Sequence, residues 1–248
     1  MKKLLSIVTV VKNDVHNIEK TIRSIISQKN IFLEYIVIDG LSTDGTFEKV
    51  KKYKKKIDKI VRQKDAGIYD AMNKGIKYSK GVFIGFCNSG DLINDGGIKL
   101  LTNSLDNKID VLFATVKRNY LGKTIVKSGY NLKRLNYNFD FATSHTTGFY
   151  IKKKLHDKVG FYDTKFKCSS DYDFYYRLLK NNKLNIKYTK KNKIIGIVKS
   201  GGFSSSFSPI EHLNEETKIR IKNQQNVLFI FLIYINALIK ILIKKIFT

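Results

Sequence analysis

Polar and acidic residues end a series of strand-like apolar runs in the first part of this chain, where they could bind or react with a small molecule. Three segments open with an apolar run of strand length and stop at a polar or acidic residue beside Gly, Ser or Asn, and a fourth follows such a run. The four segments are residues 6–13, 35–45, 65–75 and 82–91. Open α/β sheets bind their ligands where such strands end. The pattern therefore predicts a site for a polar, phosphorylated small molecule.

The elements that would position these residues alternate between strand and helix. Apolar runs without alternating polar residues suit strands that are buried on both faces, as in a parallel sheet. Strands are expected at residues 4–11, 34–39, 59–63 and 82–87, with helices between them, the first of which Asp14 is expected to cap. Successive strand–helix units predict an α/β protein with a mostly parallel central sheet flanked by helices.

From about residue 105 the pattern changes. The second half carries expected strands at residues 111–116, 124–126 and 194–198, a turn at Gly122, helices from near Lys152 and over 170–180, and a flexible loop at 201–206. The last apolar segment, residues 227–247, is expected to be a separate helix. The sequence thus predicts one domain over residues 1–205 and a C-terminal helical extension over residues 206–248.

The composition is that of a globular protein. Of the 248 residues, 43% are apolar and 27% are charged. The only two cysteines, Cys87 and Cys168, form no Cys-x-x-Cys pair, so neither a disulfide framework nor a zinc site is predicted, and a reducing compartment is favoured. The first residues resemble the start of a signal peptide, but polar residues interrupt the apolar stretch too early, which favours a first strand.

The formal net charge of +25 favours anionic ligands and anionic membrane surfaces. Of the 46 basic residues only six are Arg, and the Lys residues are scattered through every segment. A nucleic-acid-binding protein more often gathers Arg and aromatic residues on one element. The sequence therefore argues against a nucleic-acid partner, although a basic nucleic-acid-binding protein stays an alternative.

The segments, in this order, resemble the family-2 inverting glycosyltransferases of the Rossmann-like GT-A fold, and most of all the bacterial enzymes that build surface polysaccharides. The resemblance covers roughly residues 4–205. It implies transfer of a sugar from a nucleotide-diphosphate donor, expected to be a UDP-sugar, to a hydroxyl of a glycan or lipid-linked acceptor, with inversion. The alternative within the same fold is a nucleotide-sugar-binding module that has lost catalysis.

On the donor side, the resemblance assigns nucleotide binding to loops that follow the strands. The residues that it implies are Val10, Lys12 and Asn13 where the first strand ends, Asp39 at the end of the second, and Asp65 and Gly67 of the Asp-x-Gly segment. A carboxylate at position 39 can accept hydrogen bonds from a pyrimidine imide or from ribose hydroxyls. The alternative for Asp39 is a turn residue before the helix. Asp70 and Asn73 are left open between a binding role and a solvated helix surface.

The expected metal site departs from the family pattern. Where the family usually has an Asp-x-Asp motif, this chain has Asn88-Ser-Gly-Asp91, which leaves Asp91 as the only carboxylate. Magnesium sites commonly use one or two carboxylates together with phosphate oxygens and water. Asp91 is therefore expected to bind a divalent cation, Mg²⁺ or Mn²⁺. The nearby Asp95 is expected to cap a helix instead.

On the acceptor side, residues 143–150, 160–163 and 169–177 match the family's order of motifs, and the resemblance makes Asp171 the catalytic base. An inverting displacement needs one carboxylate that takes the proton of the acceptor hydroxyl. The alternative for Asp171 is a helix cap. Asp173 is expected to face elsewhere, and Arg177 to pair with a neighbouring acid. His145 is either an acceptor-side residue or a structural histidine.

The C-terminal segment, residues 227–247, is almost wholly apolar, and its Asn236, Lys240 and Lys244 repeat at four-residue spacing. The uninterrupted apolar run is shorter than the ~20 residues that span a bilayer. A helix with basic residues beside a wide apolar face is typical of the membrane interface. We therefore expect peripheral contact with the inner face of the cell membrane and a cytoplasmic location. The alternative is packing on the domain or on a second copy in a homodimer.

Overall fold

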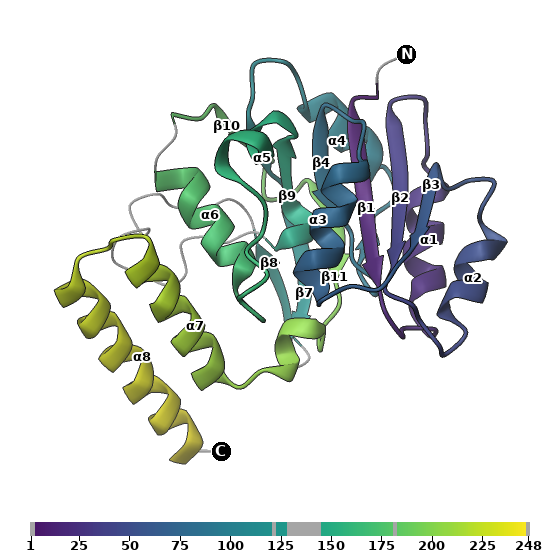
Figure 1. The fold of residues 1–248 in the computed structure, drawn as a ribbon. Helices are drawn as coiled ribbons and strands as arrows, with labels where there is room; N and C mark the ends of the chain where they lie inside the picture. Colours follow the sequence, from purple (N-terminus) through teal and green to yellow (C-terminus); the bar gives the residue numbers. More distant parts are fainter. Residues whose placement is uncertain (1–2, 121–122, 128–144, 181–182, 247–248) are drawn as a thin grey trace.

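A seven-stranded sheet forms the centre of the molecule in the computed structural model, which describes residues 3–120, 123–127, 145–180 and 183–246 (Figure 1). Its strands lie in the order β10-β6-β9-β4-β1-β2-β3. Their bounds are β1 Leu5–Val11, β2 Leu33–Asp39, β3 Lys59–Arg62, β4 Phe83–Phe86, β6 Val111–Phe113, β9 Phe149–Lys152 and β10 Ile186–Tyr188. The strands expected in the first half of the chain are thus confirmed to within two residues.

The central sheet is mostly parallel, as predicted. Strand β1 pairs in parallel with both β2 and β4, β2 pairs in parallel with β3, and β6 pairs in parallel with β10. Only β9 runs the other way, between β4 and β6. In the register of β1 and β2, Val11 lies opposite Asp39, so the loops after these two strands leave the sheet side by side.

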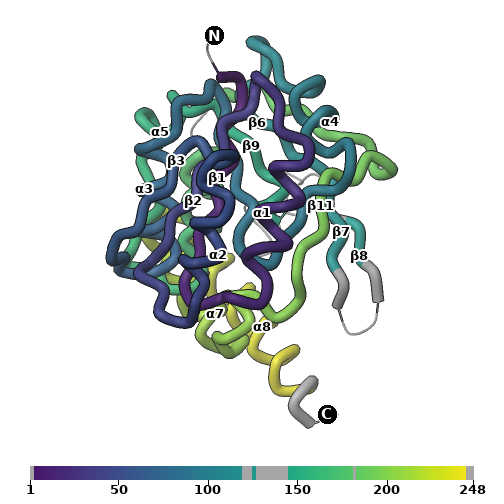
Figure 2. Tube along the Cα trace, turned by 90° about the vertical axis from the view of Figure 1, so that its right-hand side faces the viewer, coloured from purple at the N-terminus to yellow at the C-terminus, as the bar shows by residue number. Residues whose placement is uncertain are grey.

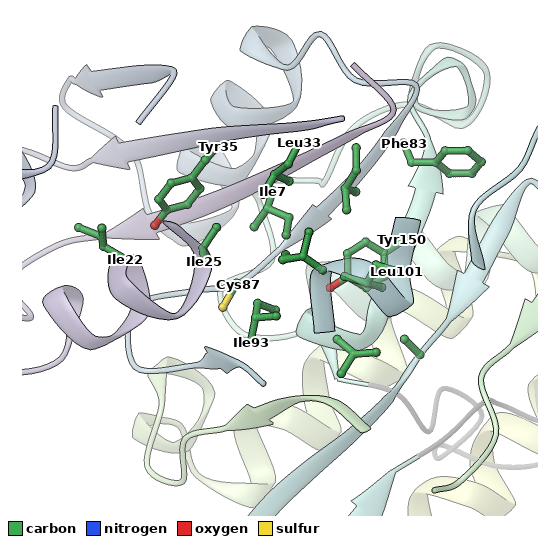
Figure 3. Packing of buried hydrophobic residues seen from close by; sticks show 14 of the residues in the cluster. Ile7, Ile22, Ile25, Leu33, Tyr35, Phe83, Cys87, Ile93, Leu101 and Tyr150 are labelled. Carbon is green, nitrogen blue, oxygen red and sulfur yellow. The ribbon is translucent and has the colours of Figure 1, made fainter. Parts of the chain in front are cut away.

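Helices cover both faces of this sheet and create two apolar layers. One layer combines Val8, Ile36 and Ile84 with apolar residues of α3 Ile68–Tyr78, α5 Lys154–Val159 and α6 Ser170–Lys180. The other joins α1 Ile18–Ile26, α2 Thr46–Lys52 and α4 Gly97–Ser104 to the opposite face, where Ile22, Ile25 and Leu101 pack near Ile7 and Tyr35 (Figure 3). Burial on both faces explains why the strands read as unbroken apolar runs.

A second, four-stranded sheet has the order β5-β11-β7-β8. Its strands are β5 Leu92–Ile93, β7 Thr115–Tyr120, β8 Lys123–Lys127 and β11 Ile194–Val198. The single strand expected at residues 111–116 is wrong, because the chain changes sheets at Ala114. There the Ala114 N–H donates to Gly148 O, and the Thr115 N–H donates to the Thr189 hydroxyl, which ends the β6 ladder. The expected turn at Gly122 lies outside the described residues.

Three helix starts differ from the prediction. Asp14 does not cap α1, which begins at Ile18 after Asn17, because the Asp14 carboxylate accepts from the Asn17 amide and from the Ser89 hydroxyl. Likewise, Asp95 does not cap α4, since the residue before that helix is Gly96 in a left-handed conformation, φ 73°. The helix expected from near residue 152 begins two residues later, because the preceding residues extend β9.

Two helices, α7 Pro209–Lys222 and α8 Val227–Ile246, follow the short 3-10 turn η3 Phe203–Ser206. Helix α7 packs on the domain: Ile219 joins the α3–α6 core layer, and Lys222 binds Asp163 and Asp173. Helix α8 lies beside α7 at the edge of the molecule (Figures 1 and 2). Among the described residues, none of the helices combines the length and the apolar character that crossing a membrane requires.

Candidate active site

One cavity of about 820 Å³ lies where the loops after β1, β3 and β4 meet the start of α6 and the segment after β11. It brings together eight of the nine predicted site residues: Val10, Lys12, Asn13, Asp65, Gly67, Asp91, His145 and Asp171. The ninth, Asp39, is buried and is not part of the lining. Residues 143 and 144 of the acceptor-side motif lie outside the described residues.

The loop after β1 is fixed by contacts with the loop after β2. Asn13 has a positive φ of 52°, a conformation that Asn adopts more readily than most residues. Its N–H donates to the Ser42 hydroxyl at 2.9 Å, and its side-chain oxygen accepts from the Thr43 N–H at 2.9 Å. These two bonds fix the conformation of the Lys12–Asn13 segment, which lines the cavity.

Asp39 combines the two roles that the sequence left open. Its Oδ1 accepts from the Ser42 N–H at 3.1 Å and lies 3.5 Å from Arg62 Nε, as expected of a turn residue beside a basic partner. Its Oδ2 is buried without a hydrogen-bond partner among the described residues. A buried carboxylate oxygen without a donor is costly, so it marks a place where a ligand donor would be stabilising.

Asp65 lies against the end of β2. A Cβ atom added to Gly40 would stand 2.0 Å from Asp65 Oδ2, so glycine is needed at that position. Asp65 Oδ1 accepts from the Gly67 N–H at 3.1 Å, and Gly67 has a φ of 124°, which disfavours any side chain. Asp39 and Asp65 thus lie near the ends of the neighbouring strands β2 and β3, with Gly40 between them in space.

Asp70 and Asn73, which the sequence left open, have structural partners. Asp70 accepts from the Ala66 N–H at 3.0 Å and pairs with Lys74 at 2.9 Å. The Asn73 side chain donates to Tyr162 O at 2.9 Å and accepts from Tyr162 N at 3.0 Å. Asn73 therefore joins α3 to the segment that precedes α6.

Asp91 is buried at the cavity wall, with 4% of its surface exposed. Its Oδ2 accepts from the Thr147 hydroxyl at 2.5 Å, and its Oδ1 accepts from the Lys199 N–H at 3.0 Å. His145 Nδ1 lies 3.8 Å from Oδ2 and also accepts from the Thr147 N–H at 3.3 Å. His145 is therefore next to the predicted metal residue, and it also acts electrostatically on Asp171. The sequence left it open between an acceptor-side residue and a structural histidine.

The residues around Asp91 fit a divalent cation. Asn88, on the same turn, has a buried side-chain oxygen without a hydrogen-bond partner among the described residues. Each carboxylate oxygen of Asp91 keeps one acceptor position, because a carboxylate has about four in all. Carboxylate and amide oxygens suit Mg²⁺ and Mn²⁺, which complete their shell with phosphate and water. Within the described ranges no three His, Cys, Asp or Glu residues are grouped for a metal, so diphosphate oxygens would have to supply the remaining ligands.

Asp171 is the second residue of α6 and lines the cavity. Its Oδ1 accepts from the Tyr69 hydroxyl at 3.1 Å and from the Tyr172 N–H at 3.0 Å. Burial raises the pKa of Asp171, and the hydrogen bonds from Tyr69 and Tyr172 and the proximity of His145 act against that rise. A carboxylate held in this way at a cavity wall is suited to receive a proton.

Asp173 and Arg177 lie away from the cavity, as predicted. Asp173 Oδ2 accepts from Arg177 Nε at 2.8 Å, and Asp173 Oδ1 accepts from Lys222 Nζ at 3.1 Å. Arg177 also donates to Phe161 O at 2.7 Å. Centred on the buried Asp173, this group ties α6 to α7 and to the segment before α6.

Four cavity residues were missed by sequence reasoning: Tyr69, Arg118, Cys168 and Lys199. Lys199 follows β11, and its side chain crosses Gly90, where an added Cβ would lie 2.6 Å from Lys199 Cδ. Tyr69 belongs to the Asp-x-Gly segment and stands out in the sequence only as an aromatic residue beside helix-forming ones. No spacing rule links residues 118 and 199 to the earlier motifs, because β7 and β11 meet only in the second sheet.

Comparison with known proteins gives concordant results. A family model described as glycosyl transferase family 2 matches residues 6–170. The putative teichuronic acid biosynthesis glycosyltransferase TuaG of Bacillus subtilis is 31% identical over 93 residues, which are 36% of this chain and 37% of TuaG. An uncharacterized glycosyltransferase of Rickettsia typhi is 27% identical over 188 residues, 71% of this chain and 59% of that protein. In both cases the matched part is less than two thirds of the relative's length.

Solved structures share the fold. S. aureus TarS in complex with UDP superposes with a TM-score of 0.70 at 19% identity, over 95% of this chain and 70% of that one. The mannosyltransferase PcManGT from Pyrobaculum calidifontis, in complex with GDP-Man and Mn²⁺, gives a TM-score of 0.66 at 15% identity, over 97% of this chain and 70% of that one. The predicted GT-A fold is confirmed. Since the family model covers well over half of the chain, this protein belongs to glycosyl transferase family 2.

Proposed function

We propose that this protein transfers a sugar from a nucleoside-diphosphate donor to a hydroxyl of a glycan or lipid-linked acceptor, with inversion at the anomeric carbon. The observation that carries the proposal is the single cavity that Asp65, Asp91 and Asp171 share in a member of glycosyl transferase family 2. In this proposal Asp65 serves the nucleotide, Asp91 the diphosphate and Asp171 the acceptor. A binding module without catalysis would not need the third.

The proposed reaction is a single displacement. The acceptor oxygen forms a bond to the anomeric carbon while Asp171 takes the hydroxyl proton. The bond between the anomeric carbon and the diphosphate oxygen breaks at the same time, and the nucleoside diphosphate leaves with the electron pair. Because attack and departure occur on opposite faces of the sugar, the configuration is inverted.

On the donor side we propose a UDP-sugar, held by the loops around Val10–Asn13, Asp39 and Asp65–Gly67. The unpartnered Asp39 Oδ2 supports this, since a uracil imide or a ribose hydroxyl would supply the missing donor. Solved relatives of the same fold hold UDP, UDP-GlcNAc or GDP-Man. Lys12, Arg118 and Lys199 also line this cavity. Their positive charges would attract the negatively charged diphosphate of the donor.

Asp91 and Asn88 would hold Mg²⁺ or Mn²⁺ together with the donor diphosphate, and His145 is close enough to Asp91 to support that group. The bound cation would neutralise the charge that develops on the leaving diphosphate. Lys199 adds a second positive group beside Gly90. The chain's own contribution is therefore to hold the diphosphate with its leaving oxygen near the cations.

The proposed setting is surface polysaccharide or glycoconjugate synthesis at the inner face of the cell membrane. On α8, Phe231, Ile235, Ile239 and Leu242 are exposed and lie on one side of the helix. No acidic residue follows Glu216, whereas Lys residues recur to the end of the chain. A wide apolar face with flanking Lys fits the interface of an anionic membrane. Residues 1–205 would then carry catalysis and residues 206–248 attachment, with α7 also packing on the catalytic domain.

The proposed function is tested by incubating the purified protein with UDP-, GDP- and dTDP-sugars, with and without Mn²⁺. The expected result is metal-stimulated turnover of a UDP-sugar and, with an acceptor, a product whose anomeric configuration is opposite to the donor's. Nucleotide binding without any turnover across the donor panel would instead support the binding module. Salt-sensitive binding to random oligonucleotides, without nucleotide-sugar binding, would support the nucleic-acid alternative.

Membrane attachment is tested by a truncation after Asn226, which keeps α7 and its core contacts but removes α8. The full chain is expected to float with vesicles that contain anionic lipid, and the truncated chain to remain in solution. If both forms partition alike, α8 instead packs on protein. A full chain that is dimeric without lipid, and a truncated chain that is monomeric, would support the homodimer.

A further inference from the structure

The start of α6 presents Asp171 to the cavity through contacts that come from a distant helix. Tyr69 lies in α3, 102 residues earlier in the chain, and its hydroxyl is 3.1 Å from Asp171 Oδ1. The same oxygen accepts from the Tyr172 N–H at 3.0 Å. Within the part of the chain that the structure describes, neither bond involves Oδ2. The two carboxylate oxygens are therefore unequal, because the Tyr69 hydroxyl and the Tyr172 N–H both donate to Oδ1.

We propose that Tyr69 is a positioning residue for Asp171: its hydroxyl fixes the carboxylate rotamer and occupies Oδ1, so that Oδ2 is the atom that receives the acceptor proton. This inference rests on the proposed function, because it takes Asp171 as the base. The inference gives a role to Tyr69, which the sequence did not single out. The segment from Asp65 to Tyr69 would then contact the nucleotide through Asp65 and Gly67 and orient the base through Tyr69.

Tyr69 is held firmly enough for this task. Its side chain is 8% exposed, and its ring packs on that of Tyr162 at a centroid distance of 5.8 Å. The Tyr162 ring in turn packs on Phe174 of α6 at 5.0 Å. The Asn73 amide fixes the Tyr162 backbone to α3 through two hydrogen bonds. Helix α3 and the start of α6 are thus joined by packed rings as well as by the Tyr69–Asp171 hydrogen bond.

Tyr69 acts as a donor in this pair. Burial, and then the neighbouring Asp171 carboxylate, raise the pKa of Tyr69 well above its usual range, so the phenol stays protonated. A phenol that donates to a carboxylate favours the ionised form of that carboxylate, which is the form that a base needs. Removal of the hydroxyl should therefore raise the pKa of Asp171. Loss of the fixed rotamer should also lower the rate, because small displacements of a reacting group are costly.

Other titratable groups also face this carboxylate, and their effects on its pKa must be distinguished from the effect of Tyr69. His145 lies on the loop before η2 Thr146–Gly148, Cys168 precedes α6, and the Tyr162 and Tyr175 hydroxyls interact electrostatically with Asp171. His145 is the one imidazole among them, and it also lies 3.8 Å from Asp91 Oδ2, so it is removed in a parallel series.

The test compares Tyr69→Phe with Tyr162→Phe. Both changes remove one buried phenol oxygen, but the Tyr162 hydroxyl has no hydrogen-bond partner among the described residues, which makes it the matched control. The full-length protein is labelled with isotopically enriched aspartate, and the carboxyl signal that disappears in Asp171→Asn is followed by NMR through a pH titration. The series is repeated in a His145→Gln background. Turnover of the donor sugar and calorimetric affinity for UDP are measured on the same samples.

We expect Tyr69→Phe to raise the pKa of Asp171, to move the acid limb of the kcat profile to higher pH, and to lower kcat by about tenfold to a hundredfold with UDP affinity unchanged. Tyr162→Phe keeps the ring and removes a hydroxyl that makes no hydrogen bond to the carboxylate, so it should change the pKa of Asp171 and kcat far less than Tyr69→Phe does. An unchanged Asp171 titration in Tyr69→Phe would overturn the inference, even if Asp171→Asn is inactive. Full activity of Asp171→Asn would instead overturn the proposed base, whatever Tyr69→Phe does.

Discussion

The donor side and the base side of the cavity are built in different ways. On the proposed donor side, Asp39 ends β2, and Asp65 and Asp91 lie in the loops after β3 and β4, so the parallel sheet brings all three to one edge. On the proposed base side, Asp171 accepts a hydrogen bond from Tyr69 of α3, and Glu215 of α7 accepts from the segment before α6. Asp171 itself was predicted from the resemblance of its motif to the family, whereas Tyr69 and Glu215, which packing between distant helices brings to it, were not.

From this comparison we predict that isosteric substitutions on the proposed donor side keep the fold but reduce the rate of sugar transfer. Asp91→Asn can keep the Lys199 N–H donation to its oxygen and offer its amide to the Thr147 hydroxyl, so the fold should persist. Without the carboxylate, metal-stimulated transfer should fall by about a thousandfold. Assays across a Mn²⁺ and Mg²⁺ titration measure this.

Asp95→Asn is the matched control for that experiment. Asp95 is exposed, four residues further along the chain, and should have no effect. If Asp91→Asn keeps the parent's rate and metal dependence, Asp91 does not bind the metal. Its position at the edge of the sheet would then not have predicted its role.

A smaller effect is expected at Asp39. Asp39→Asn leaves an oxygen for the Ser42 N–H but replaces the unpartnered Oδ2 with a donor, which opposes a uracil imide or a ribose hydroxyl. Affinity for UDP should fall by about tenfold to a hundredfold, the range for loss of a hydrogen bond to a charged group. Asp39→Ala should weaken binding in the same direction. Calorimetry with UDP that returns the parent's affinity for both variants would leave Asp39 with its turn role alone.

The sequence predicted the elements of the central sheet better than the contacts between distant parts of the chain. The strands of the first half and the parallel sheet follow from apolar runs, whereas the eight cavity-lining residues follow from motifs that resemble those of the family. The strand at residues 111–116 was wrong because the change of sheet at Ala114 depends on Gly148 and Thr189, which are distant in sequence. The caps expected from Asp14 and Asp95 were wrong for a related reason, since local propensity does not show that Asp14 is engaged by Ser89.

The smallest predicted effect concerns the support of the base side. The Glu215 carboxylate accepts from the Lys167, Cys168 and Ser169 N–H groups at 2.6, 2.9 and 2.9 Å. Burial acts to raise the pKa of Glu215, but these donors and the Cys168 thiol outweigh it and lower the pKa. Its stabilising contribution is therefore fully present above the usual Glu pKa and is lost as the pH falls through the lowered value.

Glu215→Gln should reduce the free energy of unfolding by about 1–2 kcal/mol near neutral pH, with little loss at acidic pH where the parent's carboxylate is protonated. Urea unfolding at several pH values measures this. The control is Glu48→Gln, which changes an exposed residue whose only recorded ion pair among the described residues is with Lys51. A loss of stability in Glu215→Gln that is the same at every pH would show that the α7–α6 connection does not depend on the charge.

The central claim is that Asp171 is the base of a sugar transfer, and one substitution tests it most directly. Asp171 is the second residue of α6 and not the residue before the helix, and Asn keeps an oxygen for the Tyr69 hydroxyl and the Tyr172 N–H. Asp171→Asn therefore separates a structural role from that of a base. We predict that transfer falls by about 10²–10⁴-fold, the usual cost of losing a general base, while UDP affinity and thermal stability stay at the parent's values. A folded Asp171→Asn protein that binds UDP and transfers sugar at a rate close to the parent's would contradict the account.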